Sequence, residues 1–285
     1  MKLRTWVYLL LIPSCYLVTK FCRSQTDAFT STAIASYLPP CPEWHTEPPT
    51  SEVDAILNQK FHYLTSGGQS FVFISEDKKY VLKFFKLQRI LFPSLLHQTD
   101  SSRIKKVRRD FASYLMAWQE LREETALVYL HLNRDLSFKR TITLVDKLHC
   151  QCQLNLEGIP FVLQKNVEML YPYLDQLLTS GKEKEAEEAL CTLFALIIQR
   201  CQKGILDEDP ALHKNVGFFK GKPIILDAGR FIRDPQRMHA EVYSRDLQAI
   251  TTRLEAWIKK KHPTFIANYQ NQLVKALDEK AHPPL

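Results

Sequence analysis

The sequence has no internal repeat and no low-complexity tract, and its cysteines do not form the frame of a metal site. Seven cysteines are present, and only Cys150 and Cys152 lie in a short C-x-C pattern. No pair of Cys or His residues follows them at zinc-finger spacing, which excludes a site of that kind. A disulfide scaffold is not expected either, because Cys191 and Cys201 fall in a mostly apolar helical run and are interpreted as small core residues.

The apolar run near the N-terminus is short. It extends from Thr5 to Thr19, and its 15 residues fall below the roughly 20 that a membrane-spanning helix needs. Lys2 and Arg4 precede it, and a basic start followed by a short apolar run is the layout of a secretory signal. Residues 1–35 are therefore predicted to be a signal peptide or a membrane anchor, with a merely buried helix as the third alternative.

Two patterns in this segment are candidate processing sites. The Ala33-x-Ala35 pair is of the type that signal peptidases cleave, and residues 12–15 are a loose match to a lipoprotein site with Cys15 as the acylated residue. We therefore expect the protein to be membrane-associated or exported, on a side of the membrane that the residues do not specify.

The charge balance is mildly basic. The net charge of +7 suits anionic partners such as nucleotides, lipid head groups or nucleic acid without selecting one of them. Five positive charges gather in Arg103–Arg109, which is interpreted either as a contact for an anionic membrane or as the solvated start of a helix. Because this stretch has no interleaved aromatic residues and the chain has no base-reading module, nucleic acid is not an expected partner.

The chain is predicted to have a strand-rich part followed by a helix-rich part. Residues 36–52 contain five prolines and are predicted to be an extended linker, so that the folded domain begins near Val53. Residues 53–168 are predicted to contain five strands and one long helix. The strands are Lys60–Thr65, Ser70–Ser75, Tyr80–Phe85, Thr141–Leu148 and Ile159–Lys165, and the helix is Arg103–Leu132.

Residues 169–285 are predicted to be mostly helical. Apolar residues recur at helical spacing between Leu190 and Cys201, then between Leu247 and Trp257, and again between Phe265 and Leu277. Two short strands, Val216–Phe219 and Pro223–Leu226, interrupt the helices and are joined by a tight turn. This order indicates an α+β fold with two lobes.

Binding a nucleoside triphosphate requires a flexible backbone cover, a cation on the phosphates and ligands for Mg²⁺. Gly67 and Gly68, between the first two strands, are a candidate cover, although such a pair also suits an ordinary hairpin turn. Lys83 lies in the third strand with Val81 on its own face and Leu82 on the other. It is a candidate for the cation, with a surface lysine as the alternative.

The strongest pattern is residues 204–217 followed by Asp227-Ala228-Gly229. The first segment contains Asp209-Pro210 and Asn215, and a predicted hairpin connects it to Asp227. This order of parts resembles the catalytic loop, hairpin and metal-binding Asp-x-Gly turn of protein kinases. The Asp-Pro pair is similar to that of the atypical kinases linked to ubiquinone biosynthesis.

The resemblance implies a role for each of these residues. Asn215 and Asp227 would hold Mg²⁺, Lys83 would hold phosphate oxygens of ATP, and Asp209 would orient or deprotonate an accepting hydroxyl. Gly67, Gly68 and Val72 would cover the nucleotide. Glu124, with Glu120 as second choice, would brace Lys83 from the long helix.

The sequence departs from the kinase pattern in several places. Asp209 lies six residues before Asn215 instead of five, so that Asp207 is an alternative catalytic carboxylate. Thr65 and Ser70 stand where the first and third glycines of the cover are usual. Only 56 residues follow Gly229 and no Ala-Pro-Glu is present, so that the helical lobe is expected to be reduced.

Three functional hypotheses follow. The first is an ATP- and Mg²⁺-dependent phosphotransferase acting on a protein, lipid or sugar hydroxyl. The second is a pseudokinase that binds a nucleotide or a protein without catalysis. The third is a membrane-tethered interaction protein that has no nucleotide site.

Overall fold

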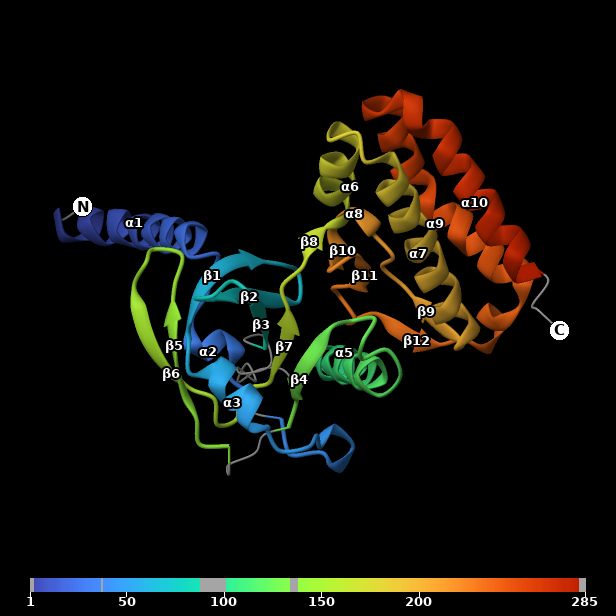
Figure 1. Ribbon diagram of the computed structural model, residues 1–285. Helices are drawn as coiled ribbons and strands as arrows, with labels where there is room; N and C mark the ends of the chain where they lie inside the picture. Colours follow the sequence, from blue (N-terminus) through green and yellow to red (C-terminus); the bar gives the residue numbers. More distant parts are fainter. Residues whose placement is uncertain (1–2, 37, 88–100, 134–137, 282–285) are drawn as a thin grey trace. The chain divides into compact units, whose positions relative to one another are not determined.

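The computed structural model describes residues 3–36, 38–87, 101–133 and 138–281. It divides into two compact units: unit 1 is Met1–Lys105 with Val128–Lys165, and unit 2 is Lys106–Leu127 with Asn166–Leu285. Unit 1 carries a large sheet and unit 2 is mostly helical (Figure 1). The predicted α+β class, strand-rich first and helix-rich second, is confirmed.

Unit 1 is built on a seven-stranded sheet in the order β4-β7-β3-β2-β1-β5-β6 (Figure 1). The predicted antiparallel meander is confirmed, since β2 pairs antiparallel with both β1 and β3. The sheet as a whole is mixed, because β5 lies parallel to β1, a pairing that the sequence did not indicate. The strands are β1 (Lys60–Ser66), β2 (Ser70–Ser75), β3 (Tyr80–Phe85), β4 (Leu127–His131), β5 (Thr141–Val145), β6 (Gln151–Asn155) and β7 (Phe161–Lys165).

One predicted element needs correction, and one strand was missed. The helix predicted over Arg103–Leu132 is α5 (Ser101–Glu120), and β4 follows it after a turn in which Ala126 has a φ of 51°. A positive φ stops helical continuation, and the β-forming pair Val128 and Tyr129 then enters the sheet. Strand β6 was not predicted, because four of its five residues are exposed and it has no apolar alternation.

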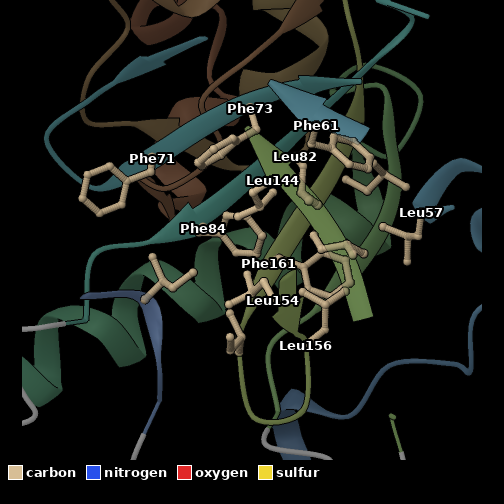
Figure 2. Packing of buried hydrophobic residues seen from close by; sticks show 14 of the residues in the cluster. Leu57, Phe61, Phe71, Phe73, Leu82, Phe84, Leu144, Leu154, Leu156 and Phe161 are labelled. Atoms are coloured by element: carbon tan, nitrogen blue, oxygen red, sulfur yellow. The ribbon is translucent and has the colours of Figure 1, made fainter. Parts of the chain in front are cut away.

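The core of unit 1 lies on one face of this sheet. Phe73, Phe84 and Phe161 pack together on this face (Figure 2). The ring centroids of Phe73 and Phe84 are 5.8 Å apart, and those of Phe84 and Phe161 are 6.4 Å apart. Leu82 belongs to the same cluster and is fully buried. Lys83 lies between Leu82 and Phe84 along β3 and therefore points to the opposite face of the sheet, as the strand alternation predicted.

The N-terminal segment contributes to this core before residue 36. Helix α2 (Ser31–Ile34) places Ala33 and Ile34 in the cluster, and both are almost fully buried. Leu87 donates its main-chain N–H to the carbonyl of Ala33 over 2.8 Å, and Phe29 packs edge-on against Phe71. Full burial of an apolar side chain such as that of Ile34 stabilises a fold by about 1.5–3 kcal/mol.

The proline-rich segment is packed as well. Its 3₁₀ turn η1 (Pro42–Trp44) buries Trp44, and Cys41 exchanges two hydrogen bonds of 2.9 and 3.0 Å with the side chain of Asn133. Helix α3 (Ser51–Leu57) follows. The expected start of the folded domain near Val53 is therefore wrong. Long-range hydrogen bonds, which prolines do not prevent, hold this extended chain against unit 1.

The N-terminal helix α1 (Leu3–Gln25) contains Pro13. None of the helices in the described part of the chain combines the length and the apolar character that crossing a membrane requires. Whether residues 1–35 act as a signal or an anchor stays a prediction.

Unit 2 packs its helices around a separate core that contains Leu174, Phe194, Leu247 and Tyr269. Helix α7 is buried on the stripe that the sequence predicted. The helices are α5, α6 (Leu170–Thr179), α7 (Glu183–Gln202), α8 (Leu212–Asn215), α9 (Ala240–Lys261) and α10 (Ile266–Ala281), with the 3₁₀ turns η2 (Pro235–Met238) and η3 (Pro263–Phe265). Although α5 precedes β4 in the chain, its residues from Lys106 onward belong to unit 2 by their contacts.

Short strands in unit 2 carry the motif that the sequence singled out. Strands β10 (Val216–Phe219) and β11 (Lys222–Ile225) form the predicted hairpin, and β8 (Glu168–Met169) pairs with β10. A Cβ at Gly217 would come within 2.5 Å of the carbonyl oxygen of Glu168, so the β8–β10 pair requires glycine there. Strands β9 (Ile205–Asp207) and β12 (Phe231–Arg233) pair separately.

Candidate functional site

The β10–β11 hairpin brings Asn215 and Asp227 to one end. Asn215 immediately precedes β10 and Asp227 follows β11 by two residues, while Val216 pairs with Ile225. The main-chain N–H of Leu226 donates to the carbonyl of Asn215 over 2.8 Å, which extends the ladder to the residue before Asp227. Antiparallel pairing therefore holds the two predicted metal ligands as neighbours.

The loop before this hairpin is anchored by a buried ion pair. Arg200 on α7 donates from Nη1 to Oδ2 of Asp207 over 3.0 Å, and the two side chains are only 4% and 3% exposed. Burial raises the pKa of Asp207, and the charge of Arg200 opposes that rise. Oδ1 of Asp207 accepts the main-chain N–H of Asp209 over 2.9 Å. Asp207 thus shapes the loop and is withdrawn from solvent, which disfavours it as the catalytic carboxylate.

Asp209 is arranged differently. Its carboxylate is 48% exposed and lies 3.5 Å from Nζ of Lys214, while its main-chain carbonyl accepts a 2.8 Å hydrogen bond from Nδ2 of Asn215. Because the Asn215 amide nitrogen is used inside the loop, its amide oxygen is the atom suited to a cation. A hydrogen bond to the main chain of Asp209 therefore joins the residue that carries the exposed carboxylate to one predicted metal ligand.

Helix α5 holds the Asp227-Ala228-Gly229 turn. The hydroxyl of Ser113, which is 1% exposed, donates to the carbonyl of Ala228 and accepts the main-chain N–H of Phe231 over 2.5 Å. The hydroxyl of Tyr114 lies 3.5 Å from Oδ1 of Asp227, and that oxygen also accepts the N–H of Gly229 over 3.0 Å. Burial and the charge of Asp227 raise the pKa of Tyr114, which therefore stays protonated and able to donate.

Asp110 lies one turn earlier on the same helix and is 5% exposed, with its Oδ1 buried and unpaired among the described residues. Burial raises its pKa from the ordinary 3.8 to about 6, against the opposing charges of Arg230 and Lys106. Sequence reasoning missed Asp110, Ser113 and Tyr114. A detectable signal was present, since their i, i+3, i+4 spacing places them on the stripe of α5 that also carries the apolar Ala117.

The proposed glutamate brace is not where the sequence placed it. Glu124 lies in the turn after α5 rather than on the helix, and its Oε1 pairs with Nζ of Lys203 over 3.2 Å. Glu120 ends the helix and pairs with Arg233. The helical assignment of Glu124 is corrected by the end of α5 at Glu120. Both glutamates instead hold the end of α5 against basic residues of unit 2.

Unit 1 carries the remaining predicted residues. On β3, Lys83 is opposite Val72 of β2 and Val162 of β7, and directly opposed residues of antiparallel strands share one face. Gly67 and Gly68 form the exposed turn between β1 and β2, and neither has a positive φ or a close neighbour that a Cβ would meet. The fold of unit 1 therefore does not require these two glycines.

The predicted site would draw Lys83 from unit 1 and Asp227 from unit 2. A site composed of these two residues stays a prediction. The basic segment Arg103–Arg109 is partly used within unit 2, since Arg109 lies 3.4 Å from Glu208, while Lys105 and Lys106 are exposed.

The described residues contain no group of three or more His, Cys, Asp or Glu side chains placed to hold a metal by themselves. Magnesium does not need such a group, because it is usually bound through one or two protein oxygen ligands together with substrate phosphates. The amide oxygen of Asn215 and the carboxylate of Asp227 are hard oxygen donors of this kind. The pair fits Mg²⁺ brought in with a nucleotide and does not fit a permanent metal centre.

No family model matches the sequence, and no curated protein matches it either. Among solved structures, the kinase domain of ROP18 in complex with AMP-PNP and sucrose is 14% identical, with a TM-score of 0.40, and the match covers 66% of this chain and 61% of that one. WbdD, solved with the kinase inhibitor LY294002, is 13% identical with a TM-score of 0.39, and the match covers 78% of this chain and 46% of that one.

A third solved structure, Rv3197 with erythromycin from Mycobacterium tuberculosis, is 13% identical with a TM-score of 0.32, and the match covers 87% of this chain and 74% of that one. This chain spans only about half the length of WbdD. These likenesses concern the fold alone, and all three have TM-scores of 0.40 or below.

Proposed function

We propose that this chain is an atypical kinase-type phosphotransferase, which binds ATP with Mg²⁺ and transfers the γ-phosphoryl group to a hydroxyl acceptor. The observation that carries the proposal is the hairpin that joins Asn215 to Asp227, together with the hydrogen bond from Asn215 to the carbonyl of Asp209. Two candidate oxygen ligands and the residue that carries the exposed carboxylate thereby belong to one small loop system. Phosphoryl transfer depends mainly on such positioning and on charge stabilisation.

In the proposed reaction, the acceptor oxygen forms a bond to the γ-phosphorus while the bond from that phosphorus to the β–γ bridging oxygen breaks. ADP leaves, and the carboxylate of Asp209 takes the hydroxyl proton. Asn215 and Asp227 would hold the Mg²⁺ ion, whose charge would offset that of the phosphates. Lys83 would hold phosphate oxygens, with Gly67, Gly68 and Val72 covering the nucleotide.

A thermal-shift titration of the full chain with ATP, with and without Mg²⁺, tests the proposal. A ligand that binds only the native state raises the melting temperature progressively as its concentration increases. At a ligand concentration 100 times the dissociation constant, the free energy of unfolding is higher by about 2.7 kcal/mol. We expect a rise that needs Mg²⁺, together with slow ADP formation. Asp227→Asn should abolish the Mg²⁺-dependent rise and Lys83→Met should weaken it.

Matched controls are available in both units. Asp278 and Lys79 are exposed, and Asp278→Asn and Lys79→Met should leave the response unchanged. ADP formation that survives both Lys83→Met and Asp227→Asn would contradict the proposal.

The second candidate is a pseudokinase that binds a nucleotide or a protein without transfer. It is favoured by Thr65 and Ser70 in place of two glycines and by the extra residue between Asp209 and Asn215. This candidate predicts either little thermal response to ATP with Mg²⁺ or a response with no ADP formation.

Membrane association or export through residues 1–35 is a separate proposal, which fractionation of cells expressing the full chain and a truncated chain would test.

A further inference from the structure

A pocket of about 300 Å³ within unit 2 is lined in part by Asp209, and its other lining residues have no role in the nucleotide proposal. It is formed by the loop that carries Asp209, by α8, by Tyr171 at the start of α6, and by Ile250 and Arg253 on α9. Its volume is at the lower end of the range for small-molecule sites, which suits a compact metabolite.

The lining combines apolar surface with uncommitted polar groups. Leu212 and Ile250 supply apolar surface. His213 and Arg253 are exposed, and neither side chain makes a hydrogen bond or an ion pair with another described residue. An uncommitted guanidinium at the wall of a pocket is a ready partner for a phosphate or a carboxylate.

Tyr171 is fixed in position. Its ring packs edge-on against Trp257, with centroids 4.8 Å apart, and contacts the ring of His213 at 6.4 Å. Burial raises the pKa of Tyr171, while the nearby charge of Arg253 opposes the rise, so the phenol is protonated at neutral pH and can donate to a ligand. The wall therefore offers an ordered aromatic residue, a hydroxyl and a cation, together with the carboxylate of Asp209.

We propose that this pocket binds the acceptor of the phosphotransferase, and that the acceptor is an anionic sugar: a compact polyhydroxy compound that carries a phosphate or a carboxylate. Arg253 binds the anionic group, His213 and Tyr171 bind hydroxyls, and Ile250 contacts the C–H surface of the ring. One hydroxyl is presented to Asp209, which accepts its proton as that oxygen bonds to the γ-phosphorus of ATP. This inference rests on the proposed function.

Direct binding tests the pocket without ATP. The full chain is titrated by calorimetry with glucose 6-phosphate, glucuronate, glucose and inorganic phosphate. Both anionic sugars should bind. Glucose and phosphate should each bind at least tenfold more weakly, because glucose lacks the anionic group that Arg253 binds and phosphate lacks the sugar hydroxyls that His213 and Tyr171 bind. Arg253→Ala should weaken the anionic sugars tenfold or more, and Arg253→Lys should restore part of the affinity.

Arg245 is the matched control, since it lies on the same helix, is exposed and does not line the pocket. Arg245→Ala should leave sugar binding unchanged. Equal binding of glucose and glucose 6-phosphate, or an Arg253→Ala variant with normal affinity, would overturn the inference. So would binding of a phosphopeptide at Arg253 in preference to both sugars.

The ATP thermal shift separates this inference from the function on which it rests. If Mg-ATP raises the melting temperature and ADP forms but no anionic sugar binds, the acceptor class is wrong and the phosphotransferase stands. If the anionic sugars bind through Arg253 but Mg-ATP does not bind, the pocket is real and its role as an acceptor site is wrong. Acceptor stimulation of ADP formation that disappears in Arg253→Ala, with an unchanged Mg-ATP shift, is the expected result.

Discussion

The guanidinium of Arg200 and the carboxylate of Asp207 form an ion pair of 3.0 Å between a helix and the loop that precedes Asn215. Both side chains are almost completely buried, and the second carboxylate oxygen accepts the N–H of Asp209. The pair therefore determines the path of the chain from β9 to the candidate site. Its contribution is conformational, because burial of two charges offsets much of their attraction.

Replacing Arg200 with Ala should destabilise unit 2 by about 3–5 kcal/mol, because it leaves the Asp207 carboxylate buried without its partner. Urea denaturation followed by circular dichroism measures the change. Arg245→Ala, an exposed arginine, is the control and should change the free energy of unfolding by less than about 0.5 kcal/mol. Equal effects of the two substitutions would show that the ion pair does not hold the loop.

Ser113→Ala should lower stability by about 1–3 kcal/mol and weaken the Mg-ATP thermal shift. The substitution removes the donor to the Ala228 carbonyl and the acceptor for the Phe231 N–H, both of which fix the turn that carries Asp227. The measurement is a melting curve with and without Mg-ATP. Thr252→Ala removes an exposed helical hydroxyl and should affect neither quantity. A normal nucleotide response in Ser113→Ala would mean that α5 does not position Asp227.

Asp110 should make the native state less stable as the pH rises from about 4 to 6. Its pKa is raised from 3.8 to about 6 by burial, so the folded protein holds the proton more tightly than the unfolded chain in that interval. The stabilising effect of the neutral form is complete below pH 4 and is lost as the pH passes through 6. At pH 7, Asp110→Asn should be more stable than the natural protein by up to about 3 kcal/mol.

The free energy of unfolding of both proteins, measured from pH 4 to pH 8 with EDTA present, tests this expectation. The difference between them should be small at pH 4 and reach its full size above pH 6. A difference that does not vary with pH would show that Asp110 keeps an ordinary pKa.

Gly67→Ala should leave stability within about 0.5 kcal/mol of the natural protein, because the nearest atom to an added Cβ is 3.9 Å away and no positive φ is involved. If Gly67 covers a nucleotide, the same substitution should weaken the Mg-ATP thermal shift. Gly217→Ala is the contrasting variant and should destabilise by about 1–3 kcal/mol, because a Cβ would lie 2.5 Å from the Glu168 carbonyl oxygen. Comparable melting temperatures for Gly67→Ala and Gly217→Ala would contradict the expectation that the fold requires glycine at position 217 and not at position 67.

Much of the candidate site could be predicted from local pattern. Alternation along β3 placed Lys83 on the face opposite Leu82, and the turn residues around Gly221 predicted the hairpin that joins Asn215 to Asp227. Both arrangements depend on strand geometry over a few residues, which the order of side chains specifies directly.

The extent of α5 and the fate of the proline-rich segment could not be predicted in this way. The helix ends at Glu120 where a tight turn precedes β4, and the chain around Cys41 is held by hydrogen bonds to Asn133, some 90 residues later. Such contacts have no signature in neighbouring residues. A proline-rich stretch looks like a free linker until its distant partner is placed against it.

The sequence by itself determined the α+β class, the three-strand meander and the pairing of an amide with a carboxylate at one end of a hairpin. Only the tertiary structure decided that Asp207 is buried against Arg200 while Asp209 stays exposed, and that Ser113 and Tyr114 hold the Asp227 turn. The physical reason is that burial and charge pairing depend on which distant elements pack together. Two carboxylates two residues apart therefore acquire different environments that their local sequence does not distinguish.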